Sequence, residues 1–416
     1  MIARLLRSYS QSNWPVTDDA PLLLDVTRLI WRRWKGRLPT GIDRVCLAYL
    51  RHFGPDAQAV VQRKGFRRIL DMKASQELFA LLEEPGDAFK VRLVAGALRN
   101  LGRFNGKARG RTYLNVGHTG LDTTGFQTWV RGAEVRPVYL VHDLIPITHP
   151  EFCRPGEQDK HRQRMRTVLT TAAGVIGNSR ATLDELTAFA RTEALPSPPA
   201  LAAWLGIDPL VQLPATEGAD RPTFVTIGTI EARKNHLLLL NIWSRLIDRL
   251  GAAAPRLLII GQRGWEADEV FDLLDRSEKL RGHVIELSRC SDEELARHLG
   301  SARALLFPSR AEGYGLPLLE ALGSGVPVIA SDLPVFREVG ADIPDYLDPL
   351  DGAAWEAAII DYSKPHSRAR RAQLQRMKSL RLPNWDSHFA PVERWLGDLG
   401  RATEADEHRL NQRLHG

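Results

Sequence analysis

Two glutamates stand in the stretch 305–332, which reads LLFPSRAEGYGLPLLEALGSGVPVIASD. Glu312 lies beside Gly313 and Gly315, and glycines let a backbone approach a ligand closely. The helix predicted after this loop directs free N–H groups and its positive dipole end at the loop, which favours phosphate binding. The Glu312 carboxylate should therefore avoid the phosphate and accept hydrogen bonds from sugar hydroxyls, and Glu320 could do so for a ribose. The alternative is a surface loop whose glutamate caps the helix.

Two adjacent cations, Arg233 and Lys234, form a second candidate site between a predicted strand, 223–227, and an apolar helix, 236–250. A guanidinium offers a fork for two phosphate oxygens and an ammonium offers a point charge, so the pair suits a diphosphate. The competing interpretation is an ordinary basic pair in the first turn of the helix. That interpretation is disfavoured because cations there oppose the helix dipole.

His142 follows a third predicted strand, 136–141, and Asp143 comes directly after it. Ligands bind at the carboxyl ends of parallel strands in open α/β sheets, so this histidine is well placed for a site. A lone histidine is, however, more often a satisfied core residue. The position alone leaves both interpretations open.

Strands and helices alternate around these residues. A strand at 304–307 and another at 326–330 flank a helix that Pro317 suits at its first turn and that Gly323 or Gly325 suits at its end. This alternation predicts an α/β fold with Rossmann-like domains. Further strands are expected at 21–26, 60–62, 113–116, 174–178, 256–260 and 283–287, and helices at 45–53, within 75–102, from 181, at 291–299 and at 387–396.

Three runs resemble the retaining glycosyltransferases of GT-B fold, family 4. The run 307–332 is similar to the family's "PS…EGFGLP.LEA…G.PV..S", with Glu312 and Glu320 as its E-x7-E element and Tyr314 where Phe is usual. The run GTIEARKN at 228–235 resembles "G…PRKN", although many members carry Arg where this chain has Thr229. The run VHDLIPITHPEF at 141–152 resembles the "HDL.P…PE" of many mannosyltransferases.

This resemblance implies a GT-B architecture, with two Rossmann-like domains facing across a deep cleft. Residues 1–212 are expected to form an acceptor-binding domain and 213–385 a nucleotide-sugar-binding domain, joined by a linker at 209–221. Residues 386–416 are expected to hold a helix that returns to the first domain, followed by a frayed tail from 400.

The same resemblance assigns roles to site residues. The catalytic group is Glu312, His142, Lys234 and Arg233, and no metal ligands are assigned. The donor-binding residues are Gly228, Thr229, Arg233, Lys234, Gly313, Tyr314, Gly315, Leu316 and Glu320. The acceptor-side residues are Gly41, Asp43, Arg44, Asp143 and Ser179, the first three in a glycine-containing loop and Ser179 also as a helix cap.

Composition limits the class of protein. The 416 residues are 44% hydrophobic and 25% charged, as in soluble globular proteins, and contain no apolar run long enough to span a membrane. No signal peptide is recognised, and three scattered cysteines, Cys46, Cys153 and Cys290, fit a reducing compartment. The expected location is therefore the cytoplasm, with attachment to the inner face of the membrane as an addition.

Positive charge is concentrated in the N-terminal half. Residues 1–215 hold 30 Lys and Arg against 20 Asp and Glu, whereas the rest hold 26 against 30. The segment 31–35, WRRWK, suits either a membrane interface or a solvated helix with its tryptophans packed inward. A second basic zone suits a solvated face or a lipid-facing surface; it comprises Arg63, Lys64, Arg67, Arg68, Arg99, Arg103, Lys107, Arg109 and Arg111. No nucleic-acid-binding motif is present.

The expected function is transfer of a hexose from a nucleotide diphosphate sugar to a glycan or lipid-linked saccharide in bacterial surface polysaccharide assembly, with retention at the anomeric carbon. The histidine motif favours GDP-mannose. UDP or dTDP donors, transferring glucose, N-acetylglucosamine or rhamnose, remain open, as does a non-catalytic scaffold. No cofactor is expected, and a divalent metal is not required because cations and a helix end face the leaving phosphate.

Overall fold

The computed structural model describes residues 22–36, 40–63, 65–84, 86, 88–99, 108–208 and 221–415. The expected linker therefore lies almost wholly outside the described residues. The chain forms two compact units, one made of Met1–Leu140, Thr170–Ile176 and Phe389–Gly416, the other of Val141–Leu169 and Gly177–His388. The predicted domain boundaries at 212 and 385 stay a prediction.

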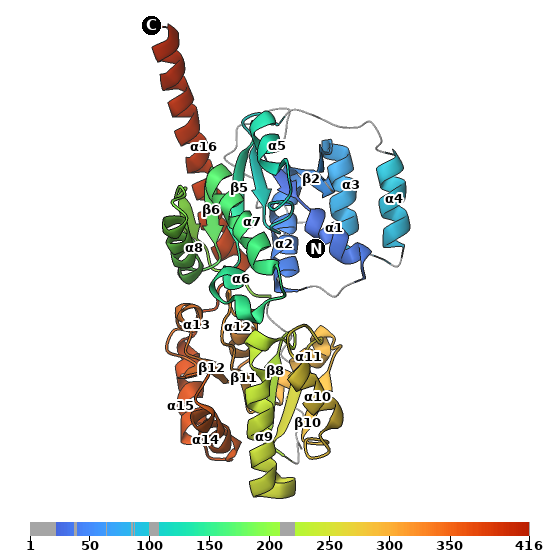
Figure 1. The fold of residues 1–416 in the computed structure, drawn as a ribbon, viewed down its shortest axis with the longest axis vertical. Helices are drawn as coiled ribbons and strands as arrows, with labels where there is room; N and C mark the ends of the chain where they lie inside the picture. Colours follow the sequence, from blue (N-terminus) through green and yellow to red (C-terminus); the bar gives the residue numbers. More distant parts are fainter. Residues whose placement is uncertain are drawn as a thin grey trace, which may run out of the picture. The chain divides into compact units, whose positions relative to one another are not determined.

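The first sheet has seven strands in the order β3-β2-β1-β4-β5-β6-β7 (Figure 1). Strand β1 pairs in parallel with β2 and β4, β4 pairs in parallel with β5, and β3 is antiparallel to β2. The strands are β1 (Leu22–Asp25), β2 (Ala57–Arg63), β3 (Phe66–Ile69), β4 (Thr112–Asn115), β5 (Arg136–Val141), β6 (Gly174–Gly177) and β7 (Ala200–Ala202). Every residue of β1, β4 and β6 is buried, as expected for strands covered on both faces.

The second sheet has six parallel strands in the order β10-β9-β8-β11-β12-β13, a Rossmann order that reverses between β8 and β11. The strands are β8 (Thr223–Ile227), β9 (Arg256–Ile260), β10 (Val284–Leu287), β11 (Ala304–Phe307), β12 (Val328–Ser331) and β13 (Asp345–Leu347). A buried cluster around Trp243, Trp355 and Phe224 forms the core beside this sheet.

Helices connect the strands throughout the described residues. In sequence up to β7 they are α1 (Thr27–Trp34), α2 (Gly41–Phe53), α3 (Met72–Glu83), α4 (Phe89–Arg99), α5 (Phe126–Gly132), α6 (Ile145–Thr148), α7 (Glu157–Thr171) and α8 (Arg180–Thr192). After β8 they are α9 (His236–Leu250), α10 (Asp268–Arg276), α11 (Asp292–Gly300), α12 (Leu316–Gly323), α13 (Pro334–Gly340), α14 (Gly352–Ser363), α15 (Arg368–Arg376) and α16 (Trp385–His415). Over these described ranges, no helix is long and apolar enough to cross a bilayer.

The structure confirms the expected α/β class and corrects three local expectations. The predicted loop at 40–44 is the first turn of α2, which a capping box of Thr40 and Asp43 begins. The edge strand β3 was not predicted, because its sequence, FRRI, has too few apolar residues to stand out. The tail expected to fray from 400 continues α16 as far as His415.

Candidate functional site

The candidate site lies in the second unit, at the point where the order of the second sheet reverses. Strands β8 and β11 are hydrogen-bonded neighbours, with Ala304 opposite Phe224 and Leu305 opposite Val225. The loops that leave their carboxyl ends, 228–235 and 308–315, carry the predicted phosphate-binding residues. Ligands of open α/β folds bind at such a switch point, so the topology brings the two motifs to one place.

A short turn separates the two cations from the helix that follows them. Ala232–Lys234 form a single 3₁₀ turn, and Asn235 adopts a left-handed conformation with φ of 57° before α9 begins. Arg233 and Lys234 therefore lie between the predicted strand and the predicted helix, directly before the N-terminus of α9, as expected. The kink directs Lys234 back toward Gly228, where an added Cβ would lie 3.4 Å from Nζ, so the glycine leaves room for the ammonium.

Glu312 holds both cations. Arg233 Nη1 lies 2.9 Å from Glu312 Oε2, Lys234 Nζ donates to Glu312 Oε1, and Ser309 Oγ donates to the same oxygen at 2.8 Å. Glu231 contacts the other edge of the guanidinium, with 2.6 Å between its Oε1 and Arg233 Nη2. Without a ligand, Glu312 is thus a counterion to the cations and is not free for sugar hydroxyls.

Burial and ion pairing oppose each other at these groups. Burial alone would raise the pKa of Glu312, but Arg233 and Lys234 lower that pKa to about 2. Burial lowers the pKa of Lys234, and Glu312 partly offsets this effect. Burial also raises the pKa of Glu231. The cluster is therefore held by charge in a poorly solvated place, where a bound anion would interact strongly.

Helix α12 begins directly after the glycine loop. Gly315 has a φ of 104°, and Phe336 lies so close that an added Cβ would come within 2.8 Å of its ring. Pro317 occupies the first turn, as predicted, and the Tyr314 hydroxyl donates to the Leu205 carbonyl at 2.9 Å. Tyr314 therefore fixes the loop through its hydroxyl, a contact that the Phe usual in the family could not make. Leu316 is the first residue of α12, and Glu320 is buried one turn further on.

The backbone of His142 and Asp143 lies against Gly313. An added Cβ at Gly313 would come within 2.5 Å of the His142 carbonyl oxygen and 2.9 Å of Asp143 Cβ. The His142 carbonyl also accepts a hydrogen bond from Asn178 Nδ2 at 2.8 Å. The structure therefore brings the predicted histidine motif and the predicted glycine loop into direct contact, and His142 itself is buried.

Asp143 and Ser179 have local structural contacts. Asp143 Oδ1 accepts from the Ile145 backbone N–H at 3.2 Å, at the start of α6. Ser179 is the predicted cap of α8: its Oγ accepts from the Thr182 backbone N–H at 3.1 Å, and its side chain is fully buried. Burial leaves Ser179 little surface for an acceptor, so capping is its observed role.

The remaining acceptor-side residues, Gly41, Asp43 and Arg44, lie in the first turn of α2. Asp43 is buried, and its carboxylate contacts Arg28 at 2.7 Å and Arg32 at 2.9 Å. These partners lower the pKa of Asp43 against the effect of burial. The carboxylate is therefore occupied within the first unit, which leaves an acceptor contact at Asp43 without support from its geometry.

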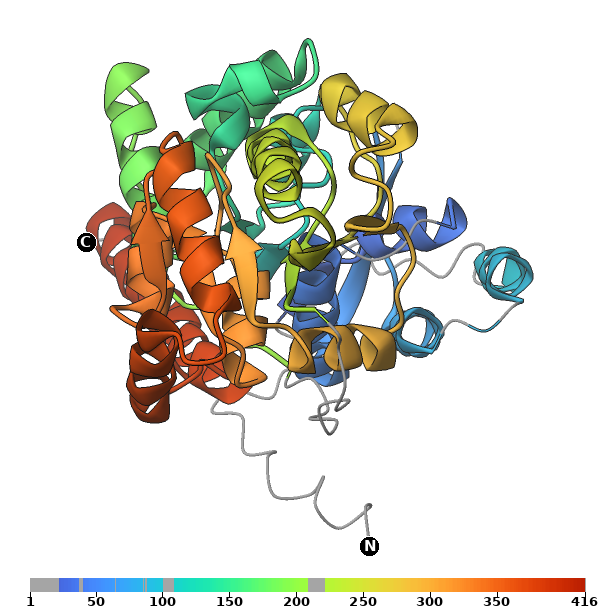
Figure 2. The same cartoon turned by 90° about the horizontal axis from the view of Figure 1, so that it is seen from below.

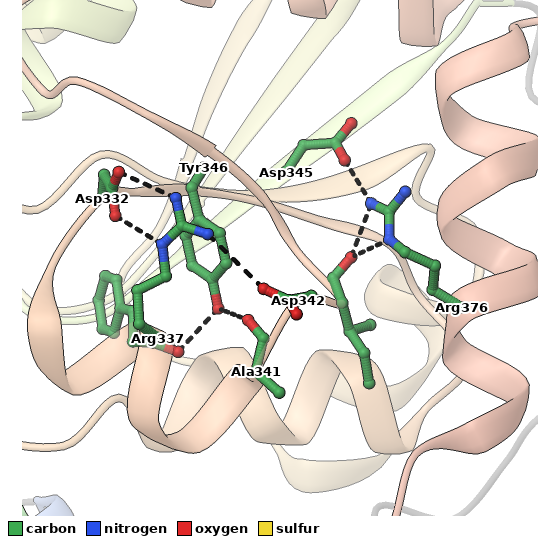
Figure 3. Close-up of polar contacts among 9 residues, drawn as sticks. Asp332, Arg337, Ala341, Asp342, Asp345, Tyr346 and Arg376 are labelled. Carbon is green, nitrogen blue, oxygen red and sulfur yellow. Dashed lines mark hydrogen bonds and ion pairs between the residues drawn. The ribbon is translucent and has the colours of Figure 1, made fainter.

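Polar contacts fix the position of helix α13, as Figure 3 shows. Arg337 pairs with Asp332, 2.7 Å from Nε to Oδ1, and lies over the Tyr346 ring at 4.2 Å. The Tyr346 hydroxyl donates to the Phe336 carbonyl at 2.7 Å. These contacts hold Phe336, whose ring stacks on Phe307 with 4.9 Å between centroids and lies next to Gly315.

Three polar residues of this region were missed by the sequence interpretation. Glu231 stands inside the GTIEARKN run and orients Arg233, and Ser309 orients Glu312. Glu338 accepts hydrogen bonds from the backbone N–H groups of Arg180 and Ala181 at 2.7 and 3.0 Å. An acid beside the cation pair was a visible signal for Glu231, whereas the contacts of Glu338 with Arg180 and Ala181 join residues more than 150 positions apart.

Known proteins resemble this chain in both sequence and fold. Residues 214–344, the segment that holds the two loops, match the family model for glycosyl transferases group 1. The chain has the GT-B fold that the sequence predicted, since solved glycosyltransferase structures align over about nine-tenths of it, and its residues 214–344 are similar to the group 1 glycosyltransferases. In the described ranges, no three His, Cys, Asp or Glu side chains come together as a metal site.

The sequence relatives are mannosyltransferases by name, and some of them are named as O-antigen chain mannosyltransferases. The serotype-specific mannosyltransferase WbdA of Escherichia coli is 31% identical over 229 residues, which cover 51% of this chain and 28% of WbdA. The O-antigen chain mannosyltransferase B of Escherichia coli is 34% identical over 161 residues, covering 39% of this chain and 42% of that protein. The matches thus span less than half the length of either relative.

Solved structures share the fold at low identity. Anabaena Alr3699/HepE in complex with UDP-glucose aligns with a TM-score of 0.63 and 14% identity, over 90% of this chain and 99% of that one. Sucrose-phosphate synthase from Thermosynechococcus elongatus aligns with a TM-score of 0.58 and 16% identity, over 93% and 99%.

Proposed function

We propose that this chain is a retaining glycosyltransferase that moves a hexose from a nucleotide diphosphate sugar to a glycan or lipid-linked saccharide. The observation that supports this proposal most strongly is the cluster of Arg233, Lys234 and Glu312 at the switch point of the second sheet. Two cations, the buried Lys234 and the partly buried Arg233, form a place for a diphosphate near the loop that precedes α12, and a carboxylate lies next to them for sugar hydroxyls.

In this proposal, the diphosphate takes over the cations that Glu312 now holds. Arg233 and Lys234 then stabilise the charge that develops on the leaving phosphate, and Glu312 is released toward the hydroxyls of the donor sugar. His142 contacts the sugar or phosphate, next to Gly313. Glu231 keeps Arg233 oriented through the exchange, because it contacts the opposite edge of the guanidinium.

The bond between the anomeric carbon and the phosphate oxygen breaks, and a bond from that carbon to the acceptor oxygen forms on the same face of the sugar. The acceptor proton passes to the leaving phosphate oxygen, so the products are the glycoside and the nucleoside diphosphate. Because the protein's own cations supply the charge, we propose that no divalent metal is required. Turnover should then persist in EDTA. If EDTA abolished turnover and added Mg²⁺ restored it, the proposal that no metal is required would be contradicted.

GDP-mannose is the proposed donor. The names of the sequence relatives favour a mannosyl donor, and the HDL run at 142–144 points the same way. UDP-glucose, UDP-N-acetylglucosamine and dTDP-rhamnose are the alternatives, and one similar structure holds UDP-glucose. The proposed setting is the assembly of a bacterial surface polysaccharide at the cytoplasmic side of the membrane, with the basic half of the chain against anionic lipid.

The test is a thermal-shift comparison of the purified chain with GDP, UDP, dTDP and CMP and with their sugars. A ligand that binds the folded state raises the melting temperature, so GDP and GDP-mannose should do so most strongly. Stabilisation by UDP or dTDP instead would show that the proposed donor is wrong, but it would agree with the proposed glycosyl transfer. A cooperatively melting sample that responds to none of these ligands would favour the scaffold.

A further inference from the structure

The first unit contains a large apolar cavity that the proposed reaction does not use. Its volume is about 1060 Å³, and α1, β2, β3, α3 and α4 each contribute to its walls. Figures 1 and 2 both show α3 and α4 side by side, with α4 as the outer of the two. Ligand pockets are commonly about 300–1,000 Å³, so the cavity has the size of a complete small-molecule site.

The interior of this cavity is aliphatic. Its wall is formed by side chains such as Ile30, Val61, Leu78, Leu81 and Leu93. These aliphatic side chains offer no hydrogen-bond partner to the hydroxyls of a saccharide, and each buried polar group needs one. A hydrocarbon chain, in contrast, gains free energy in proportion to the apolar area that leaves water.

Positive charge accompanies the apolar wall. Four arginines line the cavity, Arg63, Arg68, Arg92 and Arg99, together with one carboxylate, Glu77, whose Oε2 lies 3.8 Å from Arg99. Among the described residues, the charged side chains that line the cavity therefore carry a net charge of +3. Arginines at an apolar site are suited to a phosphate.

Two of these arginines lie over aromatic rings. Arg63 lies 5.1 Å from the centroid of Trp31, and Arg68 lies 4.5 Å from that of Phe66. Phe66 is 55% exposed although it lines the cavity. Rings with cations above them are typical of positions where apolar and aqueous surroundings meet, so a ligand with a charged head would place that head on this side.

Helix α4 adds an apolar outer surface. Its sequence, FKVRLVAGALR, has three cations and no carboxylate, and Val91 and Leu98 are 72% and 62% exposed. A helix with this composition suits the interface of a bilayer. The cavity behind it is therefore next to a surface from which a lipid could enter.

We infer that the cavity binds the single hydrocarbon chain of a lipid phosphate, with the phosphate held by the surrounding arginines. The inference rests on the proposed function in one respect, because a lipid-linked acceptor would present such an anchor. The chain's own N-terminal segment fits this cavity less well. Residues 1–17 contain Arg4 and Arg7 and no acid, so their positive charges would be repelled by the arginines of the cavity. A two-chain phospholipid would have to leave its second chain outside this one cavity.

Gly96 allows a clean test. It lines the cavity, and a Cβ added there meets nothing within 4 Å, so a side chain can enter the space without a clash in the fold. Gly132, the last residue of α5, is a matched control, because its added Cβ is also free and it does not line the cavity. Gly96→Phe should therefore fill the cavity, and Gly132→Phe should not.

The experiment is calorimetric titration of the full chain with farnesyl phosphate, without donor sugar. Wild type and Gly132→Phe should bind alike, whereas Gly96→Phe and Arg92→Glu should each lose about tenfold or more in affinity. Farnesol has the hydrocarbon chain without the phosphate, and inorganic phosphate has no hydrocarbon chain. Each should bind more weakly than farnesyl phosphate.

Three results would overturn the inference: no binding of farnesyl phosphate to folded wild type, equal binding by Gly96→Phe, or binding to phosphatidylglycerol vesicles alone. Nucleotide binding, measured on the same samples, separates this inference from the proposed function. If nucleotide binds and the lipid phosphate does not, the cavity site fails while the glycosyltransferase proposal stands.

Discussion

Arg233 and Glu312 form a partly buried ion pair, with 2.9 Å between Nη1 and Oε2, from the loops that follow the adjacent strands β8 and β11. Lys234 shares the same carboxylate. The pair joins the two motifs that the sequence assigns to phosphate and to sugar. When a donor binds here, its diphosphate must replace this carboxylate beside the cations. Donor binding and the release of Glu312 are therefore coupled in the proposed reaction.

Removing the charge of Glu312 should change stability in a pH-dependent way. Its folded pKa of about 2 is below the ordinary value of 4.5, so its ionised form stabilises the fold above pH 4.5, and this contribution is lost as pH falls toward 2. Glu312→Gln should thus be less stable than wild type at pH 7, by on the order of 3 kcal/mol. Urea unfolding at several pH values should show this difference shrinking between pH 4.5 and 2, and a constant difference would contradict the assignment.

Glu312→Ala should separate nucleotide binding from transfer. The variant leaves Arg233 and Lys234 without their shared counterion, so the diphosphate no longer competes with a carboxylate. Calorimetry should show that the nucleoside diphosphate still binds, while transfer is lost because the sugar has no orienting carboxylate. Loss of nucleotide binding in a folded variant would mean that Glu312 builds the phosphate site.

Gly313→Ala should disturb the contact between two motifs. The new Cβ would lie 2.5 Å from the His142 carbonyl oxygen, so one backbone must move. Overpacking of this kind costs about 1–3 kcal/mol, and the melting temperature should fall. Gly397→Ala is the control, since the nearest atom to its added Cβ is Arg401 Nη1 at 3.9 Å. Equal melting of both variants would show that the loop can shift freely.

Glu338→Ala should loosen the start of α8. Its carboxylate accepts from two backbone N–H groups, those of Arg180 and Ala181, and from Trp204 Nε1 at 2.7 Å. Loss of a charged acceptor costs about 1.5–3 kcal/mol, less where water can replace it. Amide exchange at Arg180 and Ala181 should become faster, and Glu338→Gln, which keeps one oxygen, should restore part of the protection. Unchanged exchange at both amides in the alanine variant would contradict a protecting role for Glu338.

Sequence patterns predicted the helices and strands that are determined by residues close together in the chain. The strands 256–260 and 304–307 and the helix 236–250 have the predicted bounds, because buried apolar runs and helical periodicity are encoded by neighbouring residues. The family motifs likewise identified the loops that meet at the switch point.

Side-chain partners were harder to predict, because they depend on packing. Asp43 was predicted to face an acceptor, yet the fold surrounds it with Arg28 and Arg32. Asn235 has a left-handed conformation that separates the turn of Lys234 from α9, and the hydrophobic pattern of the sequence does not reveal such a conformation. The apolar cavity combines five separate elements, so its arginines could be read from the sequence only as a basic zone.

The most direct test of the central claim is turnover of GDP-mannose by wild type, Lys234→Ala and Lys364→Ala. Lys364 is the control, since its ammonium is exposed and contacts Asp361 at 3.3 Å. We expect nucleoside diphosphate release by wild type and Lys364→Ala and about 100-fold less by Lys234→Ala, the scale of losing one transition-state charge donor. Wild-type turnover by a folded Lys234→Ala variant would contradict the proposed diphosphate site.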